Sequence, residues 1–204
     1  HQEMTRHLGG MSAVLASEET TKDLITEFPG VEIAAINSPR SVTVSGPSDA
    51  LIAFAAGARK RRVAVKRLPI DYPFHCSLLE PIKDDLLASL AGLSPRPVDI
   101  PMVSTVTAAM VEGTELGAQY WWQNAREAVR FSEAAAIAMQ MARVVVEIGP
   151  RPVLANYVRD TARESSRDVA VIGSLTRPER AGDRARDPSH AQVVVAVPDD
   201  ARVG

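Results

Sequence analysis

The first 68 residues alternate short apolar runs with amphipathic segments. Ser17, followed by two glutamates, predicts the start of one helix, and Ser48-Asp49, followed by apolar residues at helical spacing, predicts another. Asn37-Ser38-Pro39-Arg40 predicts a turn, because Asn and Ser bond their own backbone and Pro presets φ. Apolar runs with the length of strands occupy residues 11–16, 31–36, 41–45 and 63–68. The order βαββαβ predicts a ferredoxin-like subdomain over residues 1–68.

After Pro69 the pattern changes to longer amphipathic segments mixed with short β-branched runs. Residues 100–107 and 144–148 are predicted to be buried strands of an α/β layer. Helices are predicted over residues 77–91, 132–141 and 152–164. Such a layer normally has more strands than these, so we expect residues 69–176 to be the C-terminal part of a larger α/β subdomain.

The last part of the chain has a different character. Residues 177–188 are charged and lack apolar periodicity, which predicts a linker. The apolar run 191–197 has the composition of a strand. We interpret residues 177–204 as a linker or disordered tail.

Composition excludes several classes of protein. The chain has 204 residues, 46% of them hydrophobic, and a net charge of −2, so no general attraction to nucleic acid or to a membrane surface is expected. No apolar run approaches the roughly 20 residues that span a bilayer. The one cysteine excludes an internal disulfide, and a reducing cytoplasm fits best.

The segment from Asp71 to Leu78 is the most informative chemically. It places His75 after a proline-stiffened stretch and before an apolar helix. Histidine has an unperturbed pKa near neutrality, so it is suited to act as general base and general acid in one cycle. The alternative is a histidine packed at a strand-to-helix corner, and the chain offers no convincing nucleophile beside it.

Four ordered blocks resemble the malonyl/acyl-CoA:acyl carrier protein transacylase family, which includes the acyltransferase domains of type I polyketide synthases and their fatty-acid-synthase relatives. The resemblance covers residues 9 to about 176. It implies an α/β fold with a ferredoxin-like βαββαβ small subdomain and the C-terminal portion of an α/β-hydrolase-like large subdomain. The blocks are Gly10 to Val14, Asn37 to Pro47, Tyr72 to His75, and Tyr120 to Phe131 followed by Val146 to Pro150.

Two family features are missing from the sequence. Family members carry a G-x-S-x-G nucleophile elbow and a carboxylate-binding arginine before the first block, and no G-x-S-x-G occurs here. The chain opens with His1, so we expect a fragment whose serine nucleophile lies outside it. Arg6 is a poor candidate for the missing arginine, because the family's arginine falls slightly before His1.

The resemblance implies roles for two residues. His75 matches the catalytic base, and Asn124 matches the position that accepts from the far nitrogen of the imidazole, through its amide or its own backbone carbonyl. Asn124 as a helix-end cap remains the alternative. Arg126 and Arg130 are expected to brace local structure. Cys76 is not expected to be a nucleophile, because adjacent residues seldom face one another, and no metal site is expected.

Acyl-group specificity is expected from Tyr72, Pro73 and Phe74. In the family, a phenylalanine before the histidine accompanies malonyl selection, whereas a small residue there, with tyrosine two places earlier, accompanies methylmalonyl. The chain mixes these signatures. A large ring fills the space of an α-methyl group, and such a difference gives only about 1 to 3 kcal/mol of discrimination. We therefore expect malonyl-CoA, with methylmalonyl-CoA or another acyl-CoA as the alternative.

The one strong charge cluster is Arg59, Lys60, Arg61 and Arg62, followed by Lys66 and Arg67. Carrier proteins are acidic, so a basic rim would speed their association. The alternative is a solvated helix end whose cations complement the helix dipole.

These patterns lead to one principal hypothesis. The chain is part of an acyltransferase that moves a malonyl-type group from coenzyme A to an acyl carrier protein, with ketosynthase and other synthase domains as neighbours and no bound cofactor. The coenzyme A thioester is the substrate, and phosphopantetheine belongs to the carrier. The rivals are a non-catalytic fragment of a synthase and a ferredoxin-like ligand- or RNA-binding module. RNA is disfavoured, because the predicted sheet lacks the paired aromatic residues that stack bases.

Overall fold

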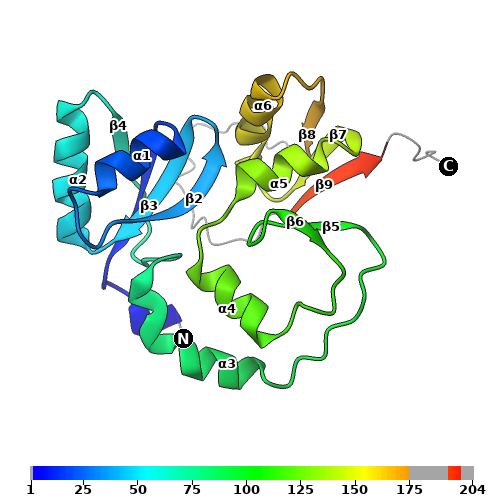
Figure 1. The fold of residues 1–204 in the computed structure, drawn as a ribbon, viewed down its shortest axis with the longest axis horizontal. Coiled ribbons are helices and arrows are strands. Elements are labelled where there is room, and N and C mark those ends of the chain that lie inside the picture. Colours follow the sequence, from blue (N-terminus) through cyan, green and yellow to red (C-terminus); the bar gives the residue numbers. More distant parts are fainter. Residues whose placement is uncertain (1, 175–192, 199–204) are drawn as a thin grey trace. The chain divides into compact units, whose positions relative to one another are not determined.

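The computed structural model describes residues 2–174 and 193–198 (Figure 1). The chain divides into two compact units, His1–Ala134 and Ala135–Gly204, and each is described by itself. None of the helices in the described ranges is long and apolar enough to cross a membrane. The expected boundary between residues 68 and 69 lies inside the first unit, and the division into 1–68, 69–176 and 177–204 stays a prediction.

The first unit contains the expected βαββαβ order. Its four-stranded sheet has the order β2-β3-β1-β4, and neighbouring strands are antiparallel. This topology is the ferredoxin-like one, and all six elements lie within a few residues of their predicted positions. The elements are η1 (Gln2–Thr5), β1 (Gly10–Leu15), α1 (Glu18–Ile25), β2 (Glu32–Ser38), β3 (Ser41–Gly46), α2 (Ser48–Lys60) and β4 (Ala64–Arg67).

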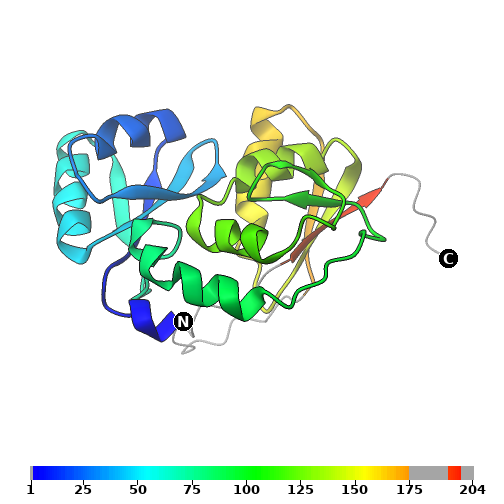
Figure 2. The same ribbon diagram turned by 60° about the horizontal axis from the view of Figure 1, so that its bottom comes forward.

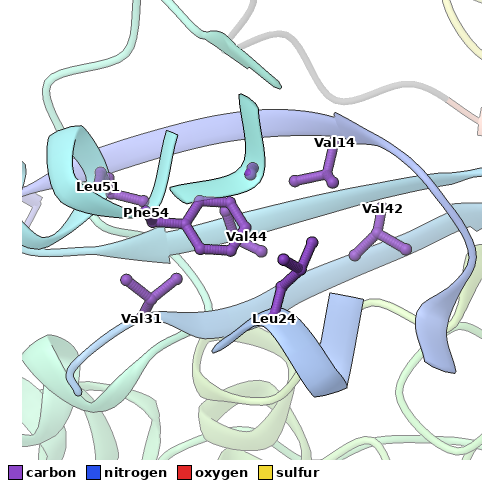
Figure 3. Close-up of a cluster of buried hydrophobic side chains, with 8 residues drawn as sticks. Val14, Leu24, Val31, Val42, Val44, Leu51 and Phe54 are labelled. Atoms are coloured by element: carbon purple, nitrogen blue, oxygen red, sulfur yellow. The ribbon is translucent and has the colours of Figure 1, made fainter. Parts of the chain in front are cut away.

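Helices α1 and α2 cover one face of this sheet. Ser17 caps α1 as expected, since its hydroxyl accepts a hydrogen bond from the Thr20 N–H at 3.2 Å. The apolar faces of both helices meet the valines of β1 and β3, and Figure 3 shows Phe54 and Leu24 reaching toward those strands. The fully enclosed side chains of this core include Val14, Leu24, Val42, Val44, Leu51 and Phe54.

Two sequence blocks of the first unit meet in space, and their backbones approach so closely that only glycine fits. Gly10 and Gly46 are partners in the β1–β3 register. A Cβ atom on Gly9 would lie 2.2 Å from the Gly46 carbonyl oxygen, which no side chain tolerates. The Gly-Gly-Met and Ser-Gly-Pro runs are therefore parts of one packed corner.

The segment after β4 forms helices of two kinds. The single helix predicted over 77–91 is a 3-10 helix, η2 (Ser77–Ile82), followed by α3 (Lys83–Leu90). Pro81 lies inside η2, where its missing N–H prevents a regular α-helical ladder. The pattern did not predict α4 (Ala118–Arg126), which lies beside α3 in Figure 2. Leu79, Ile82 and Trp122 pack together and join η2 to α4.

The buried strand predicted over residues 100–107 is present only in part, over residues 102–104. This region is a two-stranded hairpin of β5 (Met102–Ser104) and β6 (Ala109–Val111). The Ser104 hydroxyl accepts hydrogen bonds from the N–H groups of Val106 and Thr107, so its side chain turns the backbone where we expected the strand to continue.

The second unit contains a three-stranded sheet of order β8-β7-β9, with β8 parallel and β9 antiparallel to β7. Strand β7 confirms the prediction for 144–148, and β9 that for 191–197, whereas β8 was not predicted. The charged run 177–188 lies outside the described residues. The elements from this part of the chain are α5 (Phe131–Ala138), β7 (Ala142–Ile148), α6 (Ala155–Glu164), β8 (Ala170–Gly173) and β9 (Val193–Pro198).

The start of α6 is set by a buried carboxylate. Glu147 of β7 is 2% exposed, and its two oxygens accept hydrogen bonds from the N–H groups of Val153, Leu154 and Ala155 at 2.7 to 3.1 Å. These donors would otherwise be unsatisfied at the helix N-terminus, where a negative charge also complements the dipole. Glu147 therefore has a structural role that its place in an apolar run did not reveal.

Candidate active site

His75 lies in a turn between the proline-stiffened segment and η2. Its φ is +58°, a left-handed backbone conformation that is uncommon for residues other than glycine. Its backbone N–H donates to the Ala125 carbonyl, 3.2 Å away in the last turn of α4. A conformation of this kind costs on the order of 1 to 3 kcal/mol and persists only where surrounding contacts enforce it.

The imidazole of His75 makes one defined hydrogen bond. Nδ1 lies 2.9 Å from the backbone carbonyl oxygen of Glu127. A carbonyl oxygen only accepts, so Nδ1 carries the proton and Nε2 keeps its lone pair. Within the described residues, no group is bonded to Nε2. This is the tautomer that a general base needs.

The acceptor differs from the expected side chain. Asn124 lies in α4, and its amide makes no hydrogen bond to His75 in the described part of the chain. The Glu127 carbonyl takes that place, three residues farther along the same block. The reason is geometric: α4 ends at Arg126, and Glu127 is the extended residue after it, so its carbonyl turns away from the helix axis. Any other role of Asn124 stays a prediction.

Burial lowers the pKa of His75 below its usual value, and the hydrogen bond to Glu127 opposes this shift only in part. A lowered pKa favours the neutral imidazole over the imidazolium. A neutral ring with a free lone pair accepts a proton at physiological pH, which is the first requirement of acid–base catalysis.

Glu127 is held in place on both sides. Before it, α4 is packed against η2 through the buried Trp122. After it, Val129 extends the edge of the ferredoxin-like sheet: the Val129 N–H donates to Ala34 at 2.9 Å, and the Ile36 N–H donates to Val129 at 2.8 Å. The acceptor of the His75 proton is thus tied to β2.

Arg126 links α4 to two other elements through its side chain. Its guanidinium lies 3.2 Å from a carboxylate oxygen of Glu32 in β2 and 2.8 Å from one of Glu80 in η2. Glu32 also accepts the backbone N–H of Ser77 at 2.7 Å. Burial alone would lower the pKa of Arg126, but its hydrogen bond to Glu80 and the nearby negative charges raise the pKa overall. The expected bracing role is what the geometry shows for Arg126.

The three residues before His75 form a short aromatic corner. The rings of Tyr72 and Phe74 are stacked at 5.6 Å, and the Phe74 and His75 rings are 6.4 Å apart. Pro73 is buried. The Tyr72 hydroxyl donates to Glu3 at 2.9 Å, and the Arg6 guanidinium lies over the Tyr72 ring. Phe74 therefore borders the histidine, and its role in acyl-group specificity stays a prediction.

Cys76 has the environment of a core residue. Its side chain is fully buried, its thiol donates to the Pro73 carbonyl at 3.3 Å, and the Ser45 hydroxyl lies 3.5 Å from its sulfur. Burial raises the pKa of the thiol, which disfavours the reactive thiolate.

The basic cluster lies at the end of α2, and Arg59, Lys60, Arg61 and Arg62 are all exposed. Arg61 pairs with Glu27, which follows α1. No contact joins this cluster to the His75 turn within the described ranges. Among those same residues, no group of three or more His, Cys, Asp or Glu side chains is arranged to hold a metal ion.

An open cleft of about 650 Å³ lies beside the segment that holds His75. The residues that line it include Glu18, Glu127, Arg130 and Glu133. Arg130 is engaged by Glu133 at 2.5 Å and by the Thr107 carbonyl at 3.2 Å, which fits the expected bracing role.

Sequence reasoning missed three glutamates of this site. The signal for Glu32 is an acidic residue inside an apolar strand run, which its partly buried ion pair with Arg126 explains. Glu80 lies in a helical segment and resembles any exposed surface residue in the sequence. Glu127 contributes only its backbone carbonyl, which leaves no mark on the sequence.

The sequence and the structure are both similar to those of known acyltransferases and polyketide synthases. Residues 2–196 match the family described as acyl transferase domain. The chain is 42% identical over 184 residues to polyketide synthase GfsB of Streptomyces halstedii, and this match covers 86% of the chain but 3% of that protein.

Solved structures have the same fold. The acyltransferase domain from module 8 of the salinomycin polyketide synthase matches with a TM-score of 0.80 and 30% identity, over 84% of this chain and 41% of that one. A malonyl CoA-acyl carrier protein transacylase from Clostridium perfringens matches with a TM-score of 0.74 and 25% identity, over 82% and 54%. This likeness confirms the expected fold class, a ferredoxin-like subdomain with part of an α/β-hydrolase-like one.

Proposed function

Because the chain belongs to the acyl transferase domain family, we propose that it forms the histidine-bearing part of an acyltransferase in polyketide or fatty acid biosynthesis. The transferred group is of malonyl type, the donor is a coenzyme A thioester, and the acceptor is the pantetheine thiol of an acyl carrier protein. The observation that carries this proposal is the His75 imidazole, with Nδ1 bound to the Glu127 carbonyl and Nε2 bare.

The chemistry assigned to His75 has two halves. In the first, a serine hydroxyl attacks the thioester carbonyl while Nε2 takes the hydroxyl proton. Collapse of the tetrahedral intermediate breaks the carbon–sulfur bond, and Nε2–H returns the proton to the departing coenzyme A thiol. In the second half, Nε2 removes the proton of the carrier thiol, the thiol attacks the serine ester, and the proton returns to the serine. The nucleophilic serine comes from outside residues 1–204, since the sequence has no G-x-S-x-G.

The neighbours of His75 support the choice of acyl group and partner. The ring of Phe74 lies 6.4 Å from the imidazole. A large ring beside the base leaves less room for an α-methyl group, which supports malonyl over methylmalonyl. The exposed cations at Arg59 to Arg62 suit the acidic surface of a carrier protein. A cytoplasmic location remains the expectation from the single cysteine.

Intact-protein mass spectrometry after incubation with malonyl-CoA tests this function. We expect this chain alone to gain no acyl group, and a version extended upstream to include a G-x-S-x-G elbow to gain one malonyl group and pass it to a carrier protein. The matched control is the extended protein carrying His75→Ala, which should acylate far more slowly.

Two outcomes would contradict the proposal. Acylation of the chain by itself would mean that one of its own residues is the nucleophile. An extended protein that binds malonyl-CoA without acylation would favour the non-catalytic alternative.

A further inference from the structure

Hydrogen bonds and ion pairs connect Arg126 to the His75 turn in two ways, through its neighbours in the chain and through its side chain. The carbonyls on either side of this arginine, those of Ala125 and Glu127, hold the backbone and the ring of His75. Its guanidinium is bound by Glu32, which also accepts the N–H of Ser77, two residues after His75. The turn is thus tied to the same short segment from both directions.

We propose that Arg126 is a positioning residue for the base: its guanidinium fixes the end of α4 against β2 and η2, so that both carbonyls that hold His75 keep their places. This inference rests on the proposed role of His75. It goes beyond local bracing, because it assigns to one ion-pair network the task of keeping Nδ1 protonated and Nε2 bare.

The chemistry of the guanidinium suits this task. Arg126 uses Nε for Glu80 and a terminal nitrogen for Glu32, so the planar group spans two carboxylates from separate elements. Its side chain is only 19% exposed, against 69% for the surface Arg163 that pairs with Asp160. A pair shielded in this way is screened less by salt than an exposed one, and it holds its geometry better.

The strain at His75 explains why such a device is needed. A φ of +58° is not held by local preference, so the turn relaxes unless outside contacts maintain it. Three contacts hold the turn from outside: the Ala125 carbonyl accepts the His75 N–H, the Glu127 carbonyl accepts from the imidazole, and the Glu32 carboxylate accepts the Ser77 N–H. Two of them flank Arg126 in the chain, and the third is its ion-pair partner.

The proposal is tested with the variant Arg126→Met of the full 204-residue chain. Hydrogen exchange measures the protection of the backbone amides, and nitrogen NMR measures the tautomer of the His75 imidazole. We expect the amides of His75 and Ser77 to exchange about 10-fold faster or more, while the β3 amide of Val44 is unchanged. We also expect the imidazole to lose its pure Nδ1–H form. Arg163→Met, which removes an exposed paired arginine from α6, is the matched control and should change none of these.

A second variant keeps the test decisive if Arg126→Met is poorly folded. Glu80→Gln removes the negative charge of one partner of Arg126, lies at an exposed side chain and touches none of the hydrogen bonds that hold the turn. It should produce the same changes at smaller amplitude. In the extended protein, Arg126→Met should lower kcat about 10- to 100-fold with little change in KM, because the base is misplaced rather than the substrate site lost.

The outcomes separate the two claims. Unchanged exchange of His75 and an intact Nδ1–H tautomer in both variants would overturn the positioning role. Uniformly faster exchange, including Val44, would also overturn it, since Arg126 would then serve only general stability. If His75→Ala leaves acyl transfer intact in the extended protein, the proposed function fails, whereas the exchange result still decides whether Arg126 positions the turn.

Discussion

His75 and Glu147 both lie where an extended segment leads into a helix, but their side chains are used in opposite ways. Both oxygens of Glu147 are occupied by N–H groups at the start of α6, and the side chain is 2% exposed. His75 commits only Nδ1, to the Glu127 carbonyl, and within the described residues nothing bonds its Nε2. A polar group with all its bonding capacity used stabilises the fold, whereas one with an unused atom is available for chemistry.

The backbone conformations at the two positions also differ. The residues after Glu147 enter α6 without a positive φ, whereas His75 is held at +58°. Strain that the surrounding contacts maintain is a feature of functional sites. Both residues belong to family blocks, so motif membership does not separate them, whereas the hydrogen-bonding capacity left on each side chain does.

The largest effect is expected from His75→Ala in the extended protein. Loss of the base should lower the rate of acyl transfer about 10²- to 10⁴-fold, because general acid–base catalysis contributes on that scale. Steady-state transfer to a carrier protein measures it. A rate within a few-fold of the unsubstituted protein would mean that the two corners do not differ in function.

Glu147→Ala should have the next largest effect, and on stability rather than on chemistry. It leaves the N–H groups of Val153, Leu154 and Ala155 without their acceptor, so the free energy of unfolding should fall by about 3 kcal/mol. Urea denaturation measures it. Glu164→Ala, at the exposed end of α6, is the control and should change stability by less than about 0.5 kcal/mol. An equally small effect for Glu147→Ala would remove its structural role.

A smaller effect is expected from pH. The pKa of folded His75 is lowered by burial, whereas the unfolded residue titrates near 6.5. Below about pH 6.5 the unfolded chain takes up a proton that the folded chain does not, so stability falls as the pH falls; above it, the contribution is constant. The difference between the unfolding free energies of the chain and of His75→Ala should therefore be flat above pH 6.5 and decline below it. A decline on the alkaline side would contradict the lowered pKa.

The backbone strain at His75 can be measured separately. Glycine accepts a φ of +58° without strain, so His75→Gly should be more stable than His75→Ala by about 1 kcal/mol. Both variants lack the ring, which makes them a matched pair in denaturation experiments. Equal stability would mean that the turn relaxes freely and is not strained.

The smallest effect is expected from the exposed cations of α2. Replacing Arg59, Lys60 and Arg62 by Glu should raise the KM for an acidic carrier several-fold and weaken the dependence of the rate on salt, with kcat unchanged. Carrier titrations at two ionic strengths measure it. An unchanged KM would leave these residues as a solvated helix end.

Much of the first unit could be predicted from sequence because its patterns are local. The βαββαβ order follows from alternating runs and from caps such as Ser17, and the family blocks pointed to His75. The hairpin at Met102–Val111 could not be predicted, because one serine hydroxyl redirects a run with the composition of a strand. Strand β8 could not be predicted either, because its four residues are too few to show a pattern and its partner β7 lies on the other side of α6 in the chain.

The hydrogen bonds and ion pairs that hold His75 and Arg126 could not be predicted from the sequence, for a different reason. The acceptor of the His75 proton is a backbone carbonyl, and any residue type at 127 supplies one. The partners of Arg126 are 46 and 94 positions away along the chain, at Glu80 and Glu32. Asn124 was the expected partner because its side chain matched a motif, but only the three-dimensional path of the chain after α4 decides which carbonyl faces the ring.

The position of the proton on the His75 imidazole decides whether this residue can act as the base. Long-range nitrogen–proton NMR on the selectively labelled chain at pH 7 distinguishes the two neutral forms and the imidazolium. We expect a neutral ring protonated at Nδ1 with Nε2 bare, and we expect this resonance pattern to be lost in a variant that displaces Glu127. A ring protonated at Nε2, or a charged imidazolium at pH 7, would contradict this expectation.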